Sequence, residues 1–146
     1  MTTHSENQTA IADLVHGYAD LVRMKRGGQC GRLFCEDATY ELCEIDRDDL
    51  LAQPRRRWLL EGRSAIEDYV GRATQSDMQI RPEIQDLIVE IDGDMACSTC
   101  LMTSHTVPPG PGTFGRYEDS YRREAGEWRF QARIYTIILS GKGGSQ

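Results

Sequence analysis

Apolar and polar side chains alternate over most of the second half of the chain, from Ile80 to Leu139. Alternation of this kind, interrupted by turn residues, predicts three or four long strands joined by hairpins. The interruptions fall at Asp92-Gly93-Asp94, in the proline- and glycine-rich run 107–112, and at Ala125-Gly126. Because an Asp-Gly pair favours a tight hairpin turn, we expect a strongly twisted antiparallel sheet.

The start of the chain has a different spacing, with apolar residues every three or four positions from Asn7 to about Met24. This spacing predicts an amphipathic helix. Asn7 or Thr9 is the expected N-cap, and the glycines at 27–28 are expected to end the helix. A second, short helix is predicted over 29–34.

Two short strands and a third helix are predicted before the long strands. The strands cover 39–45 and 58–61, and the polar segment 46–57 between them is either a flap over a pocket mouth or a disordered loop. Ser64 and Glu67 form a Ser-x-x-Glu capping box, which predicts the start of the third helix. The order of elements predicts an α+β fold: a curved antiparallel sheet of about six strands, with three N-terminal helices on its concave face and a hollow between them.

Length and composition fit one domain of 146 residues, with an ordered core over about 8–139 and a glycine-rich tail at 141–146. The net charge of −6 argues against nucleic-acid binding, and the basic cluster at 54–57 is expected to be a solvated loop. No apolar run approaches the ~20 residues of a membrane span, and the first residues are polar. We therefore expect no membrane partner, no signal peptide and a cytoplasmic location.

Five cysteines raise the question of a metal site, because Cys97 and Cys100 form a CxxC motif. In a strand these two positions point to opposite faces, so their thiolates are poorly placed to share one ion. An odd number of cysteines favours reduced, mostly buried thiols. No metal and no cofactor is predicted.

Short motifs along the chain occur in an order that is typical of one family. They are YADL at 18–21, LFCEDA at 33–38, LEGRSAI at 60–66, VEIDGDMA at 89–96, GRYED at 115–119 and WRFQAR at 128–133. Together they cover about 8–139, and the chain resembles the SnoaL-like branch of the nuclear-transport-factor-2-like superfamily. The resemblance implies a cone-shaped α+β barrel that is usually a homodimer, with a pocket for a hydrophobic or aromatic small molecule.

Members of this family have several functions, so the resemblance leaves two hypotheses. One is a cofactor-independent lyase, isomerase or cyclase that uses acid–base chemistry on a carbonyl compound, like scytalone dehydratase or ketosteroid isomerase. The other is a non-catalytic binding or assembly subunit, like the β subunit of a ring-hydroxylating dioxygenase. Catalytic relatives commonly carry an Asp after the first helix and a His early in the third long strand. This chain has Arg23-Met24-Lys25 and Arg81-Pro82-Glu83 there, so neither role is transferred and the enzyme assignment stays open.

The last hairpin gives a candidate catalytic residue. A two-residue turn at Ala125-Gly126 pairs Asp119 with Ala132 and Tyr117 with Ile134, all on the core face. Burial would raise the pKa of Asp119 toward the range of an acid or base, although a structural carboxylate is the alternative. The same register pairs Glu118 with Arg133 on the opposite face. A shift by one residue would exchange the two faces, so the sequence leaves open whether Asp119 or Glu118 and Arg133 face the pocket.

His105 is the second catalytic candidate, because it ends its strand near the expected pocket mouth; an ordinary surface histidine is the alternative. In the enzyme hypothesis Asp119 or His105 moves a proton while tyrosine hydroxyls hold the substrate oxygen. Core packing is the alternative role of these tyrosines. The predicted substrate-binding set is Tyr18, Tyr40, Trp58, Tyr117, Ala132 and Ile134.

Overall fold

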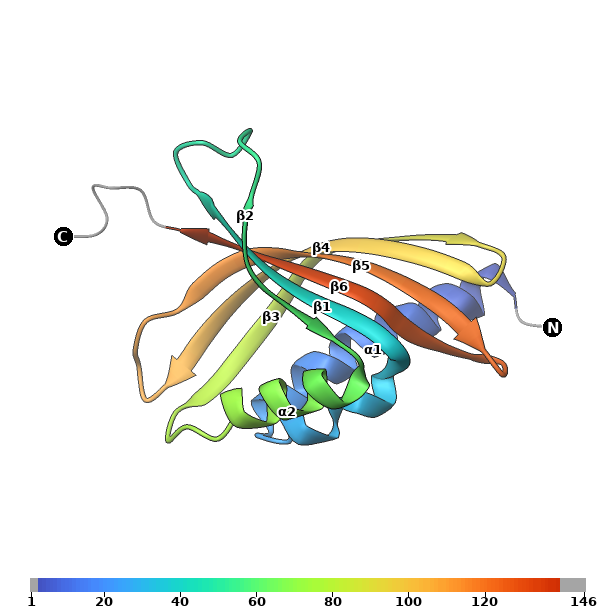
Figure 1. Cartoon of the computed structure of the whole chain (residues 1–146), viewed down its shortest axis with the longest axis horizontal. Helices are drawn as coiled ribbons and strands as arrows, with labels where there is room; N and C mark the ends of the chain where they lie inside the picture. The colour runs from blue at the N-terminus through green and yellow to red at the C-terminus, as the bar shows by residue number, and fades with distance from the viewer. Residues whose placement is uncertain (1–2, 140–146) are drawn as a thin grey trace.

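The computed structural model describes residues 3–139, which form the helices and strands shown in Figure 1. The helices are α1 (His4–Arg23), the 3-10 helix η1 (Gly27–Leu33) and α2 (Arg63–Ala73). The strands are β1 (Phe34–Asp46), β2 (Arg55–Glu61), β3 (Gln79–Asp92), β4 (Met95–Val107), β5 (Thr113–Glu124) and β6 (Glu127–Leu139). The glycine-rich tail predicted at 141–146 lies outside the described residues.

The six strands form one curved, open sheet in the order β2-β1-β6-β5-β4-β3. The predicted α+β class and the curved sheet with helices on one side are confirmed. Neighbouring strands are antiparallel except β1 and β6, which run parallel. The all-antiparallel expectation was wrong at this pair. No hairpin joins β1 to β6, so no turn fixes their relative direction.

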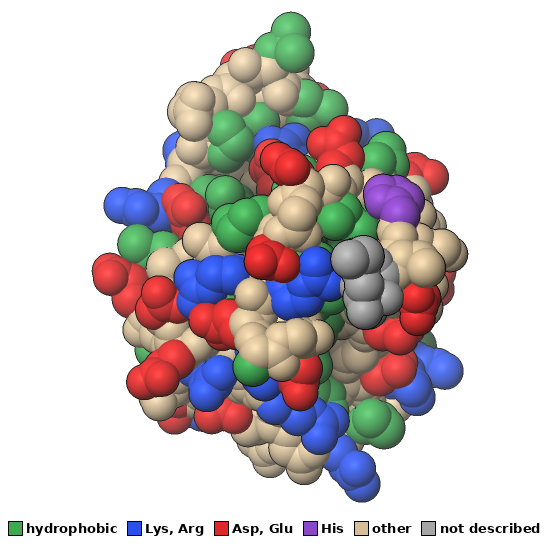
Figure 2. Space-filling view, turned by 90° about the vertical axis from the view of Figure 1, so that its right-hand side faces the viewer, with side chains coloured by type: hydrophobic (Ala, Val, Ile, Leu, Met, Phe, Trp, Pro, Cys, Tyr) green, Lys and Arg blue, Asp and Glu red, His purple; other side chains and the backbone are tan. Residues whose placement is uncertain are grey.

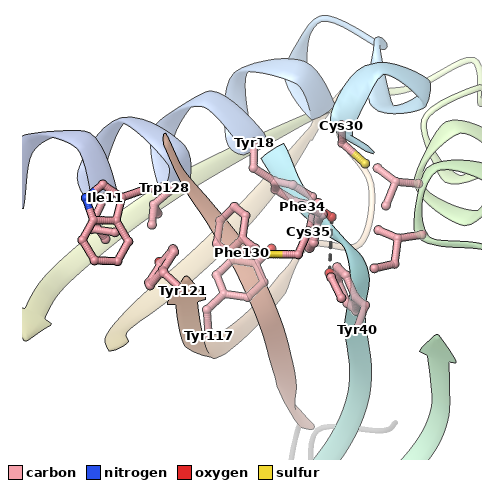
Figure 3. Close-up of a cluster of buried hydrophobic side chains, with 14 of the residues drawn as sticks. Ile11, Tyr18, Cys30, Phe34, Cys35, Tyr40, Tyr117, Tyr121, Trp128 and Phe130 are labelled. Carbon is pink, nitrogen blue, oxygen red and sulfur yellow. Dashed lines mark hydrogen bonds between the residues drawn. The ribbon is translucent and has the colours of Figure 1, made fainter. Parts of the chain in front are cut away.

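The helices lie against the concave face of the sheet (Figure 1). The inner side of α1 carries Ile11, Val15 and Tyr18, at the spacing expected of an amphipathic helix. These side chains meet an aromatic cluster in which the rings of Phe34 and Phe130 stack with centroids 4.9 Å apart (Figure 3). The core therefore fills the part of the concave face that α1 covers. None of the helices within residues 3–139 is long and apolar enough to cross a membrane.

The segment between β1 and β2 projects away from the helices in Figure 1. It is shorter than predicted, because β2 already begins at Arg55. The basic cluster is therefore part of an edge strand and not a loop: Arg55 pairs with Asp46 at 3.4 Å and Arg57 with Glu44 at 3.0 Å. Figure 2 shows the same mixing on another face, where acidic and basic side chains are interspersed.

Both predicted N-caps were wrong. Thr3 caps α1, and its side chain and that of Glu6 form a reciprocal capping box. Asn7 is buried one turn further along, where its side-chain oxygen accepts a hydrogen bond from Trp128 Nε1 at 3.1 Å. At α2 the N-cap is Gly62, so the predicted box at Ser64 does not form.

Glu67, the other half of the predicted box, takes part in a tertiary contact. Its Oε2 accepts a hydrogen bond from the backbone N–H of Gly31 at 3.2 Å, and this hydrogen bond links α2 to η1. A tertiary partner has thus replaced the local one that the motif predicts.

The hairpin between β5 and β6 has the predicted two-residue turn, with positive φ angles of 51° at Ala125 and 82° at Gly126. Next to the turn the register is also as predicted: Arg123 pairs with Trp128, and Tyr121 pairs with Phe130. From the turn to the Tyr121–Phe130 pair, the side chains of both strands therefore face the sides of the sheet that the sequence predicts.

A β-bulge then changes the register. Tyr121 pairs with Phe130 but Ser120 pairs with Ala132, so Gln131 is an extra residue in β6. Beyond the bulge Asp119 pairs with Arg133, Tyr117 with Tyr135 and Glu118 with Ile134. The predicted pairs of Asp119 with Ala132, Tyr117 with Ile134 and Glu118 with Arg133 were wrong for this reason.

The two helix starts give a matched pair of substitutions. Thr3→Ala removes a side chain that accepts from the Glu6 backbone N–H, and we expect it to lower the free energy of unfolding by about 1 kcal/mol. Ser64→Ala removes no capping hydrogen bond and should change it by less than about 0.5 kcal/mol. Urea denaturation measures both. Equal losses in the two variants would contradict the assigned caps.

Candidate functional site

A pocket of about 350 Å³ lies between the concave face of the sheet and the helices α1 and α2. Its wall is mostly apolar and aromatic. Residues from six different elements contribute to it, among them Tyr18, Tyr40, Trp58, Met102, Tyr117 and Ile137. These residues come from α1, β1, β2, β4, β5 and β6, so the curvature of the sheet brings together side chains that are distant in the sequence.

Two tyrosine hydroxyls meet at the wall of this pocket. The hydroxyl of Tyr18 donates a hydrogen bond to the hydroxyl oxygen of Tyr40 at 3.3 Å (Figure 3). Burial raises the pKa of both hydroxyls well above their ordinary range, so both stay protonated at neutral pH. Because Tyr18 uses its proton on Tyr40, the proton of Tyr40 is available to a ligand. The pair can therefore donate one hydrogen bond to a ligand oxygen.

A second group of hydroxyls lines the pocket from β4, β5 and β6. The hydroxyls of Ser104 and Thr113 lie 2.6 Å apart, and that of Thr113 lies 3.2 Å from Tyr135 Oη. Thr106 Oγ1 is buried without a hydrogen-bond partner among the described residues, and Thr106 lines the same pocket. A buried hydroxyl without a partner is costly, so it is a further place for a ligand polar atom.

A buried ion pair lies behind the tyrosines. Arg133 Nε is 3.0 Å from Asp119 Oδ1, and both side chains are fully buried. The guanidinium stacks on the ring of Tyr117, with its central carbon 3.4 Å from the ring centroid, and lies 4.5 Å from the ring centroid of Tyr18. Tyr121 donates a longer hydrogen bond of 3.5 Å to Asp119 Oδ2. Neither charged residue lines the pocket itself.

Burial dominates the titration of this pair. It raises the pKa of Asp119 to about 6, against the opposing effects of Arg133 and Tyr121. Burial also acts to lower the pKa of Arg133, but the Asp119 carboxylate and the neighbouring tyrosines together outweigh it, so the pKa is raised and the guanidinium stays charged. The register predicted from the sequence placed Arg133 on the opposite face from Asp119. The sequence indicated this ion pair only indirectly, because a carboxylate on an apolar face needs a cation nearby.

The two catalytic candidates are not brought together. His105 lies on the outer face of β4, where its side chain is 59% exposed and Nε2 is 3.5 Å from Glu83 Oε1. It does not line the pocket, and Asp119 is buried behind the tyrosines on the inner face. Asp119 and His105 thus do not form an Asp–His pair.

The predicted substrate-binding residues divide at the bulge. Tyr18, Tyr40, Trp58 and Tyr117 line the pocket. Ala132 and Ile134 do not, because the bulge turns them to the outer face. Side chains that the sequence reasoning missed occupy the corresponding inner positions, Tyr135 and Ile137 among them.

The cysteines are arranged as the CxxC spacing indicated: Cys97 is exposed and Cys100 is buried. Among residues 3–139 no group of three or more His, Cys, Asp or Glu side chains is placed to hold a metal ion.

The SnoaL-like domain model matches residues 3–134. The chain belongs to the SnoaL-like domain family. No curated protein matches it in sequence.

Several solved structures share the fold. One is the beta subunit of a proposed aromatic-ring-hydroxylating dioxygenase from Novosphingobium aromaticivorans: it is 19% identical, with a TM-score of 0.74 over 92% of this chain and 91% of that one. A proposed scytalone dehydratase from the same organism is 14% identical, with a TM-score of 0.74 over 91% and 85%.

A third solved structure, a proposed dehydratase of the NTF2-like family from Streptomyces avermitilis, is 14% identical to the chain, with a TM-score of 0.73 over 94% and 99%. At these identities the three comparisons establish the fold alone, since one fold serves many functions.

The buried carboxylate should leave a signature in the pH dependence of stability. The folded-state pKa of Asp119, about 6, lies above its ordinary value of 3.8, so protonation favours the folded state. This contribution is complete below about pH 4 and is lost as the pH rises through 6. The free energy of unfolding of the native protein relative to Asp119→Asn should therefore fall by up to about 3 kcal/mol between these pH values.

Chemical denaturation at a series of pH values measures the difference, and Glu118→Gln, on the outer face of the same strand, is the control. A constant difference between the native protein and Asp119→Asn would show that Asp119 is not buried as described.

Proposed function

We propose that this SnoaL-like protein binds a hydrophobic, ring-containing small molecule that carries an oxygen atom. The Tyr18–Tyr40 hydroxyl pair is the observation on which this proposal depends, because it provides a protonated donor in the wall of an apolar pocket. A volume of about 350 Å³ falls in the range of small-molecule sites, and the aromatic side chains supply the surface that a ring would bury.

The polar groups in the pocket wall fit an uncharged ligand or one with a single polar end. They are mainly hydroxyls, including those of Tyr18, Tyr40, Tyr135, Ser104, Thr106 and Thr113. Among the described residues that line it there is no Asp, Glu, Lys, Arg or His. A carbonyl or phenolic oxygen would accept the proton of Tyr40, and the rest of the ligand would contact apolar side chains.

Catalysis is the second candidate function, in the form of a cofactor-independent lyase, isomerase or cyclase. The hydroxyl pair favours it, because the proton of Tyr40, with Tyr18 donating to the Tyr40 oxygen, can polarise a carbonyl or stabilise an enolate. The fold shared with a proposed scytalone dehydratase adds a structural precedent. The ion pairing of Asp119 and the outward position of His105 weigh against the proton transfers assigned to them.

An assembly role, comparable to that of a dioxygenase beta subunit, is the alternative without chemistry. We keep the expectation of a homodimer for the isolated protein. A stable complex with a larger partner chain, measured by light scattering on the purified protein, would favour the assembly role over the small-molecule one.

Two isoleucines on one strand test the pocket. Ile137 lines it, whereas Ile134 lies on the outer face of β6. We expect Ile137→Ala to weaken binding of 2-naphthol roughly fivefold or more, because it removes apolar contact area, and Ile134→Ala to leave binding within about twofold. Fluorescence titration measures both. Equal effects would mean that the ligand does not occupy this pocket.

The hydroxyl pair is tested by Tyr40→Phe. This variant should weaken binding of 2-naphthol about tenfold and leave binding of naphthalene unchanged, because only the naphthol has an oxygen to accept the bond. If the protein also turns over enolisable ketones such as 2-tetralone, Tyr40→Phe should abolish the turnover and His105→Ala should not. Turnover that requires His105 would contradict the role given to the tyrosines.

A further inference from the structure

The ion pair of Asp119 and Arg133 has an orientation relative to the pocket. The guanidinium carbon is 3.4 Å from the ring centroid of Tyr117 and 4.5 Å from that of Tyr18, two rings that also line the pocket. In the sheet, Arg133 on β6 pairs with Tyr40 of β1 on one side and with Asp119 of β5 on the other, and the Asp119 carboxylate accepts a hydrogen bond from Tyr121. The positive end of the pair is therefore the end nearer to the ligand site.

The guanidinium of Arg133 is only partly hydrogen-bonded. Its Nε lies 3.0 Å from Asp119 Oδ1 and its Nη2 donates to Asp119 at 3.4 Å, whereas Nη1 is buried with no hydrogen-bond partner among the described residues. A buried ion pair produces a strong local potential on the side of each charge, because little water is present to screen it.

The ionisation of the pocket hydroxyls shows the same asymmetry. Burial raises the pKa of Tyr18, Tyr40 and Tyr135, and Arg133 opposes that rise in all three. Asp119 and Arg133 both act on Tyr117, Tyr121 and Cys100, where the carboxylate raises the pKa and the cation lowers it. Of the two charges, it is the cation that acts on Tyr18, Tyr40 and Tyr135.

We propose that the Asp119–Arg133 pair acts as a fixed dipole behind the tyrosines, so that the pocket prefers ligands whose oxygen carries negative charge, such as phenolates and enolates, over neutral ligands of the same shape. Arg133 is then a positioning residue that acts through Tyr18 and Tyr117 without touching the ligand. The preference for anionic ligands rests on the proposed function, because it requires that the pocket binds a ligand. The effect of the ion pair on the tyrosine hydroxyls does not depend on ligand binding.

Three proteins separate the effects of charge and of folding. The native protein keeps the dipole, Asp119→Asn keeps the cation without its counter-ion, and the double variant Asp119→Asn with Arg133→Met removes both charges. A buried pair is often replaced by uncharged residues without loss of stability, so the double variant is a suitable reference. The expected order in preference for an anion is Asp119→Asn first, then native, then the double variant.

The ligand measurement uses 6-cyano-2-naphthol, whose ionised and neutral forms differ in absorbance, with naphthalene as a probe of shape alone. Relative to the double variant, the bound naphthol should be ionised at lower pH in the native protein, by roughly threefold in its ionisation constant, and by at least about tenfold in Asp119→Asn. Affinity for naphthalene should agree within about twofold in all three proteins. Loss of packing would weaken both ligands together and would not produce this order.

A second measurement needs no ligand. Difluorotyrosine at position 40 ionises in an accessible pH range, and its absorbance titration should give the same order of ionisation constants in the three proteins. Identical ionisation in all three would overturn the proposal, for the naphthol or for the labelled tyrosine. If neither naphthol nor naphthalene binds the native protein, the proposed function fails, and the tyrosine titration still decides whether the dipole acts on the pocket.

Discussion

The bulge at Gln131 determines which side chains of β6 enter the interior of the molecule. Side chains alternate along a strand, so one extra residue exchanges the inner and outer sets for everything that follows. It brings Arg133 to the inner face opposite Asp119 and sends Ile134 outward. Without it, a carboxylate would be buried with no cation beside it, a situation that costs several kcal/mol.

The ion pair connects the core to the pocket. Arg133 lies between the carboxylate on one side and aromatic rings on the other, and two of those rings, Tyr18 and Tyr117, also form the pocket wall. Movement of the guanidinium would therefore disturb the ligand site. A core residue in this position contributes both to stability and to the electrostatic potential in the pocket, and the two contributions can be separated only by substitutions that change charge and volume independently.

Much of the fold could be predicted from the sequence because local patterns determine it. The spacing in α1 and the Ala125-Gly126 turn are set by neighbouring residues, and so the helix face and the first pairs of the last hairpin were right. What failed depended on distant partners. Glu67 contacts Gly31 in place of Ser64, and β1 runs parallel to β6 although nothing nearby in the sequence fixes that direction.

The candidate site divides in the same way. The inward positions of Tyr18 and Tyr40 follow from the helical and strand periodicity of their own elements, and Tyr117 lies on β5, whose alternation continues without interruption. Ala132 and Ile134 lie beyond the bulge, and Gln131-Ala132-Arg133 contains no glycine or proline to mark it. The bulge is favoured by a non-local requirement, the pairing of Asp119, which a strand read by itself does not reveal.

The proton chemistry open to this pocket is limited by what faces it. Burial holds the tyrosine hydroxyls protonated, so they donate hydrogen bonds and do not act as bases near neutral pH. The buried carboxylate of Asp119 does not line the pocket and is paired with Arg133. A reaction here would have to proceed through polarisation of a ligand oxygen, with the proton acceptor supplied by water or by the ligand itself. Catalysis therefore needs a proton acceptor that the pocket wall does not provide, whereas binding needs no proton acceptor. For this reason binding is the function that the geometry supports best.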